Sequence, residues 1–91
     1  MVDNMPDKIL FKLTNNESEG KAVIVVDLYG DVETTVWQGM LGPEEKTDEI
    51  GIYKDQWDHG HAKWYWSGGS TLSGDISDNS CWNLSGDETI C

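Results

Sequence analysis

Hydrophobic and polar residues alternate along short stretches of this chain with a period of two. Residues 8–14 place Ile9, Phe11 and Leu13 on one side and mostly polar residues on the other. This period is typical of a β-strand that is buried on one face. No stretch convincingly repeats its apolar residues every 3.6 positions or so, as an amphipathic helix does. The pattern therefore predicts an all-β protein.

Clusters of Gly, Asn, Asp, Ser and Pro divide the chain into seven or eight short strands. The most apolar one, residues 21–28, has Ile24 and Val26 on one face and further valines on the other, which predicts a central strand covered on both faces. The other predicted strands are residues 8–14, 33–41, 47–53, 61–67, 71–77 and 81–84, with a short addition at 89–90.

Turns recur about every ten residues, which is typical of a β-sandwich. We therefore expect one domain, residues 1–91, that folds as a compact antiparallel β-sandwich. A small closed β-barrel would give the same pattern and is the alternative.

Acidic residues dominate the charge: 17 Asp and Glu oppose six Lys, there is no Arg, and the formal net charge is −11. This charge repels phosphate backbones and anionic lipids, so we expect no direct binding to nucleic acid. Neutral glycans, cations and basic protein surfaces are the partners that it permits. Taken alone, it indicates a solvated surface that keeps the protein in solution.

The first seven residues are polar and acidic, unlike a secretory signal, and no apolar run approaches the roughly 18 residues of a transmembrane helix. We expect a cytoplasmic protein or one released without a classical signal. Cys81 and Cys91 bracket a short C-terminal segment. A disulfide between them and two reduced thiols are both open at this point.

Five tryptophans in a short chain predict either an aromatic core or a recognition surface. Alternation places Trp64 and Trp66 on the same strand face as Ala62, and such a face is usually buried. If one of these two rings is exposed, it can stack on a sugar or a lipid headgroup together with rings from the neighbouring loop and strand. The predicted ligand-binding residues are Trp57, Trp64, Trp66, Tyr53 and Tyr65.

Two polar clusters contain side chains of the kinds that bind metals. The first is Asp55, Asp58, His59 and His61, and the second is Asp75, Ser77, Asp78 and Asn79. The first is compressed around Gly60 at a turn, whereas zinc ligands usually come in better-separated pairs. The second lacks the glycine and the downstream acid of an EF-hand. We expect solvated turns, no metal and no cofactor, and, without a nucleophile motif, no catalysis.

The sequence FKLTNNES at residues 11–18, the apolar strand after it and the turn LGPEE at residues 41–45 follow one another in a characteristic order. This order resembles small β-sandwich proteins of the aegerolysin kind and small insecticidal β-sandwich proteins. The resemblance covers residues 9–66, and the sequence SCW at residues 80–82 matches only a fragment of the tryptophan-rich stretch of aegerolysins. It implies a β-sandwich that acts in a toxin system.

Together these features predict a non-catalytic recognition module for a glycan or lipid headgroup. The alternative is an acidic inhibitor that mimics nucleic acid and blocks a nucleic-acid-binding enzyme, for which carboxylates must line up on one face. A structural or assembly subunit is a third hypothesis, supported only by the exposed edge strands of such a sandwich.

Overall fold

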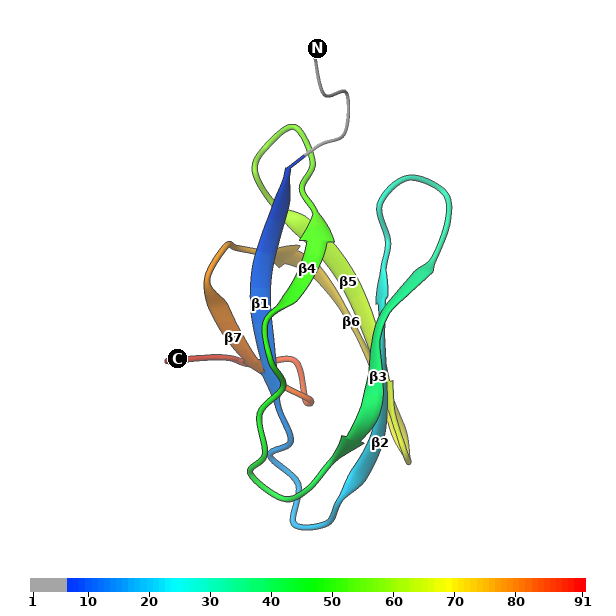
Figure 1. Ribbon diagram of the computed structural model, residues 1–91, viewed down its shortest axis with the longest axis vertical. Coiled ribbons are helices and arrows are strands. Elements are labelled where there is room, and N and C mark those ends of the chain that lie inside the picture. Colours follow the sequence, from blue (N-terminus) through cyan, green and yellow to red (C-terminus); the bar gives the residue numbers. More distant parts are fainter. Residues whose placement is uncertain (1–6) are drawn as a thin grey trace.

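Two four-stranded sheets face each other in the computed structural model, which describes residues 7–91 (Figure 1). The strand order is β4-β1-β7-β8 in one sheet and β3-β2-β5-β6 in the other. The strands are β1 Lys8–Thr14, β2 Lys21–Asp27, β3 Thr34–Leu41, β4 Ile50–Tyr53, β5 Gly60–Trp66, β6 Gly69–Ile76, β7 Ser80–Asn83 and β8 Glu88–Thr89. The all-β sandwich is confirmed, and its two sheets are not closed into the alternative barrel.

The pairing is antiparallel at every interface between these strands except one. In the first sheet, β1 runs antiparallel to β4 but parallel to β7, with Phe11 opposite Ser80. In the second sheet, β2 pairs with β3 and β5, and β5 pairs with β6, all antiparallel. The predicted antiparallel pairing therefore holds for every strand pair of the described residues except β1 and β7. The chain crosses from β6 into the other sheet before β7, and this crossing rather than a hairpin sets the direction of β7.

The core lies between the inner faces of the two sheets, as the alternation predicts. Trp64 on β5 is fully buried, with ring centroids 6.3 Å from Phe11 and 6.4 Å from Trp82. Its indole Nε1 donates a hydrogen bond to the carbonyl of Leu84 at 2.8 Å, so the one polar atom of the Trp64 side chain has a partner although it is buried. The core cluster comprises Ile9, Phe11, Leu13, Val23, Val25, Leu41, Ile50, Ile52, Ala62, Trp64, Ile76 and Leu84.

A disulfide bond between Cys81 and Cys91 connects β7 to the end of the chain. Of the two possibilities open from the sequence, the structure contains the bonded form. Its sulfur atoms attach the C-terminal segment to the outside of the first sheet, next to Asn79, whose carbonyl lies 3.6 Å from the Cys91 Sγ. Residues 7–91 include no helix long and apolar enough to cross a membrane.

Candidate ligand-binding site

Two tyrosine rings lie side by side over a cavity near one end of the sandwich. Tyr29 follows β2 and Tyr53 ends β4, and their ring centroids are 5.4 Å apart with the planes tilted by 52°. Tyr29 is 46% exposed, so its ring is available to a ligand. The cavity has a volume of about 210 Å³ and is lined by Lys8, Asp27, Tyr29, Thr34, Val36 and Tyr53.

A buried carboxylate fixes the two tyrosines relative to each other. Asp27 is 4% exposed, and its Oδ1 and Oδ2 accept hydrogen bonds from the backbone N–H groups of Tyr29 and Tyr53, each at 3.0 Å. Since Tyr29 follows a strand of one sheet and Tyr53 belongs to the other, this side chain joins the two sheets at the site. Asp27 is thus a positioning residue for the ring pair.

The remaining lining side chains add polar and apolar groups around the rings. Lys8 lies opposite Tyr53 in the β1–β4 ladder, and its Nζ is 4.9 Å from the Tyr53 ring centroid. Val36 lacks a cross-strand partner because the register shifts between Val25 and Val26. Such a bulge bends the strand locally and redirects side chains. The cavity therefore offers ring faces, an ammonium group, the hydroxyl of Thr34 and an aliphatic wall.

Trp57 occupies the loop between β4 and β5, and 69% of its surface is exposed. Asp55 shapes this loop: its Oδ1 accepts hydrogen bonds from the backbone N–H of Trp57 at 2.8 Å and of His59 at 3.1 Å. Its Oδ2 lies 2.7 Å from Nε2 of His61, and this hydrogen bond lowers the pKa of Asp55 to about 2. Figure 1 shows the loop at the same end of the sandwich as the connection that carries Tyr29.

The other predicted ligand-binding residues lie elsewhere. Trp64 is fully buried, so its ring takes no part in a surface site. Trp66 packs partly buried against the core on the same inner face. Tyr65 lies on the opposite face of β5, with the Nζ of Lys63 at 4.8 Å from its ring centroid. Of the five residues, only Tyr53 and Trp57 come to the end that carries the cavity.

The histidine cluster separates into independent pairs in the structure. His61 bonds to Asp55, whereas Nδ1 of His59 lies 3.2 Å from Asp75 of β6. Asp58 pairs with Lys54 at 3.2 Å. Within residues 7–91, no group of three or more His, Cys, Asp or Glu side chains is arranged to hold a metal ion. In the second cluster, Asp78 accepts the backbone N–H of Leu10 and so serves the junction between β1 and β7.

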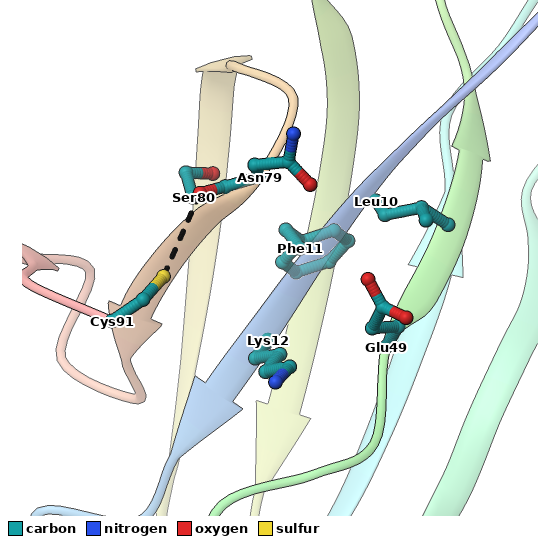
Figure 2. Close-up of a pocket in the computed structure, with 7 residues that line it drawn as sticks. All are labelled: Leu10, Phe11, Lys12, Glu49, Asn79, Ser80 and Cys91. Atoms are coloured by element: carbon teal, nitrogen blue, oxygen red, sulfur yellow. Dashed lines mark hydrogen bonds between the residues drawn. The ribbon is translucent and has the colours of Figure 1, made fainter.

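A second cavity, of about 150 Å³, lies on the outer side of β1 next to the disulfide (Figure 2). Its lining residues are Leu10, Phe11, Lys12, Glu49, Asn79, Ser80 and Cys91. Figure 2 shows Leu10 and Glu49 on one side of the strand and the other wall formed by Asn79, Ser80 and Cys91. The one aromatic residue among them, Phe11, is 1% exposed and belongs to the core. This cavity therefore lacks the accessible rings that the first one has.

Sequence reasoning missed most of the residues that complete the first cavity. Tyr29 stands in a turn sequence with Gly30 and Asp31, which indicated only where the strand ends. Asp27 was the available signal, because a carboxylate inside an apolar strand needs buried partners. Lys8 could not be assigned, since its neighbourhood depends on how β1 pairs with β4.

Comparison of the chain with protein-family models, with curated proteins and with solved structures gave no match. The resemblance to aegerolysins and small insecticidal proteins therefore stays a prediction.

Proposed function

We propose that this protein is a non-catalytic recognition module that binds one sugar ring of a neutral glycan against the surface formed by Tyr29 and Tyr53. The observation that carries the proposal is the tilted ring pair over a cavity with polar side chains at its wall. Aromatic faces pack against the apolar C–H faces of a sugar, while nearby donors and acceptors bind its hydroxyl groups. Lys8 and Thr34 are the polar groups available for those hydroxyls.

The size and charge of the site narrow the ligand class. The volume of about 210 Å³ lies below the roughly 300–1,000 Å³ of pockets for drug-sized ligands, so a single ring fits better than a longer ligand. The net charge of −11 disfavours anionic sugars and phosphate-bearing headgroups. A second sugar that leaves the cavity toward the β4–β5 loop would meet Trp57, whose exposed indole supplies a further stacking surface.

The test is a screen of neutral mono- and oligosaccharides on a glycan array, followed by calorimetry of the strongest ligand with Tyr29→Ala. Loss of one stacking contact costs about 1–3 kcal/mol, by analogy with base stacking. The dissociation constant should therefore rise about 5- to 150-fold. Tyr29 is exposed, so we expect the circular dichroism spectrum of the variant to match that of the wild type.

Tyr65→Ala is the matched control, because Tyr65 also has a lysine ammonium over its ring but lies away from the cavity. It should bind like the wild type. An array without binding, or equal affinities for Tyr29→Ala and the wild type, would refute the proposal. Binding to phosphatidylcholine vesicles that Tyr29→Ala abolishes would assign the same site to a lipid headgroup instead.

The acidic inhibitor remains a second candidate because carboxylates gather at the opposite end of the sandwich. The turn after β1 and the connection after β3 are joined there by backbone hydrogen bonds of Asn15 with Glu44 and Glu45, at 2.8 and 2.9 Å. Glu17, Glu19 and both of these glutamates are exposed. Inhibition of a panel of nucleases, reduced by Glu17→Gln/Glu19→Gln and by high salt, would support this candidate. No inhibition in low salt would exclude it for those enzymes.

A further inference from the structure

Strand β3 forms one edge of the β3-β2-β5-β6 sheet, and its free side pairs with no other strand of residues 7–91. β4 approaches it across the sandwich but belongs to the other sheet (Figure 1). An edge strand presents main-chain N–H and C=O groups that can pair with an added strand. The free side of β3 is therefore a surface on which a further strand can bind.

The hydrogen bonds of Ala22 show which main-chain groups of β3 point to its free side. The N–H of Ala22 donates to Oγ of Ser67 at 2.9 Å, and its carbonyl accepts from the N–H of Ser67 at 3.0 Å, so both groups point away from β3. Ala22 lies opposite Met40, and Ile24 lies opposite Gln38. In an antiparallel ladder such non-bonded pairs alternate with bonded ones, and both members turn their main-chain groups away from each other. Gln38 and Met40 thus direct two donors and two acceptors to the free side.

β3 lacks most of the features that protect edge strands from unwanted pairing. Usual protections are short length, lysines, prolines, bulges and covering loops. The eight residues of β3 include no charged side chain and no proline. A bulge opposite Val25 and Val26 bends its first half, but residues 37–41 keep a regular register with β2. This regular run is open to pairing.

The other edges of the two sheets are better protected. β4 has four residues, and the carboxylate of Asp27 binds the N–H of Tyr53 at its end. β8 has two residues. β6 carries Asp75, and the turn after β7 covers part of it, because Oγ1 of Thr71 donates to the carbonyl of Leu84 at 3.0 Å. Among the edges of the described residues, β3 is therefore the most open to an added strand.

The side chains next to the free groups indicate what an added strand would contact. Trp37 is partly buried against the core, and its indole extends over Gly39, where an added Cβ would lie 3.1 Å from Cη2 of the indole. Met40 on the other face of β3 is 66% exposed. Aromatic and β-branched residues on neighbouring strands pack well against each other. A strand with Val, Ile or Thr at alternate positions would fit beside Trp37.

The charges around β3 favour a basic partner. Exposed carboxylates stand near both ends of the strand and belong to Glu19, Asp31, Glu33, Glu44 and Glu45. The lysines near these ends are fewer, namely Lys21, Lys46 and Lys63. The net charge of −11 attracts a basic segment from a distance and repels a second copy of this chain.

We propose that the edge of β3 binds an extended basic segment of another protein, which adds to the sheet as a further strand beside Gln38 and Met40. Main-chain hydrogen bonds supply the affinity in this mode of recognition, and alternate side chains supply the specificity. Lysines or arginines at the ends of the segment meet the carboxylates at the ends of β3. Thr34 and Val36 line the cavity of the proposed glycan site, whereas the paired run begins after them, so the two sites can be tested separately.

The probe is a phage-displayed library of short peptides with Val, Ile or Thr at alternate positions and two lysines at each end. The strongest binder is synthesised, and its affinity for the wild type is measured by calorimetry. Added salt should weaken binding by screening the attraction between peptide and protein. A version of this peptide with glutamates in place of the terminal lysines should bind at least about tenfold more weakly.

Met40→Pro removes one donor on the free side without removing a bond to β2, and edge strands tolerate proline at such positions. We expect the affinity for the peptide to fall about tenfold, as the loss of one hydrogen bond and obstruction by the ring predict. Leu72→Pro is the matched control. Leu72 lies on the free side of β6, opposite Lys63, and its 67% exposure nearly equals that of Met40. This variant should bind like the wild type, and circular dichroism and thermal unfolding verify that both variants fold.

Hydrogen exchange of the wild type gives a second readout that needs no variant. In the free protein, the amides of Gln38 and Met40 should exchange fast, whereas that of Gly39, which is opposite Val23 in a bonded pair, should exchange slowly. The peptide should slow the exchange of Gln38 and Met40 at least about tenfold and leave that of Leu72 unchanged.

Several results would overturn the proposal. They are a library without binders, equal affinity of the lysine and glutamate peptides, equal loss of affinity in Met40→Pro and Leu72→Pro, and no added protection of Gln38 and Met40. A wild type that sediments as a dimer without peptide, and that Met40→Pro converts to a monomer, would assign the edge to a second copy of this chain instead.

Discussion

Asn15 makes the densest set of buried side-chain hydrogen bonds in the described residues, and its removal is a direct test of the fold. It is fully buried at the end of β1. Its Nδ2 donates to the carbonyls of Glu19 at 2.8 Å and Leu41 at 2.9 Å, and its Oδ1 accepts from the backbone N–H of Glu17 at 2.9 Å. One amide therefore closes the turn after β1 and joins it to the end of β3.

Asn15→Ala removes all three bonds at once. Each is worth about 0.5–1.5 kcal/mol, so the loss should be about 1.5–4.5 kcal/mol. The carbonyl of Leu41 belongs to a residue that is 2% exposed, which favours the upper part of this range because water does not easily replace the amide. For a domain of this size the melting temperature falls about 4–8 °C per kcal/mol. We expect a decrease on the order of 10–30 °C.

Urea unfolding followed by tryptophan fluorescence measures this loss, with Asn16→Ala as the adjacent control. Asn16 is exposed and makes one side-chain bond, to Oγ of Ser85 at 3.2 Å, so its removal should cost less than about 0.5 kcal/mol. Asn15→Asp keeps the acceptor for Glu17 but turns a carboxylate toward two carbonyls, and it should be no more stable than Asn15→Ala. If Asn15→Ala were as stable as the control, the amide would not organise this end of the sandwich.

Two further predictions concern the segment from β4 to β5. Gly60→Ala should destabilise the protein by about 1–3 kcal/mol, because the new Cβ would lie 2.7 Å from Cδ1 of Ile9 and would overlap Ile52. In a urea double-mutant cycle, Ile52→Val should recover part of this loss, and a neutral Gly60→Ala would contradict the packing. The hydrogen bond with His61 lowers the pKa of Asp55 to about 2, below the usual value of about 3.9. The ionised carboxylate therefore stabilises the folded protein fully above about pH 4, and this stabilisation is lost as the pH falls through about 2. The free energies of unfolding of the wild type and of Asp55→Asn, measured as the pH is lowered, should converge at low pH. A difference that stays constant with pH would refute this prediction.

Alternation along the chain predicted the strands well, because it depends only on neighbouring residues. Ile9, Phe11 and Leu13 are buried as expected, and Leu10, the exception in the pattern, lies on the outer face. The strand expected at residues 47–53 begins later, at Ile50, because the Thr47 side chain replaces a backbone partner: its Oγ1 accepts the N–H of Leu13 at 3.1 Å. A side chain that substitutes for the ladder leaves no mark in hydrophobic periodicity.

Pairing and the candidate site were harder to predict, because both depend on contacts between distant residues. The parallel pair of β1 and β7 joins Phe11 to Ser80, and no local signal specifies such a partner. The cavity draws Lys8 from β1, Tyr29 from the connection after β2 and Tyr53 from β4. Only Tyr53 was predicted, because it lies near Trp57 in the sequence. The aromatic residues that cluster in the sequence, by contrast, include Trp64, whose side chain is buried in the core and does not reach the cavity.

Strand β2 shows how departures from a simple pattern mark the candidate site. A strand with one face in the core and the other toward solvent would ordinarily alternate apolar and polar residues and would contain no buried acid. β2 departs twice: its outer face carries Ile24 without a covering layer, and its apolar run ends in the buried Asp27. Both departures cost stability in a monomer, since exposed apolar surface is unfavourable and a buried carboxylate must be compensated. The buried Asp27 is compensated by the hydrogen bonds that it accepts from the N–H groups of Tyr29 and Tyr53, and these bonds build the cavity.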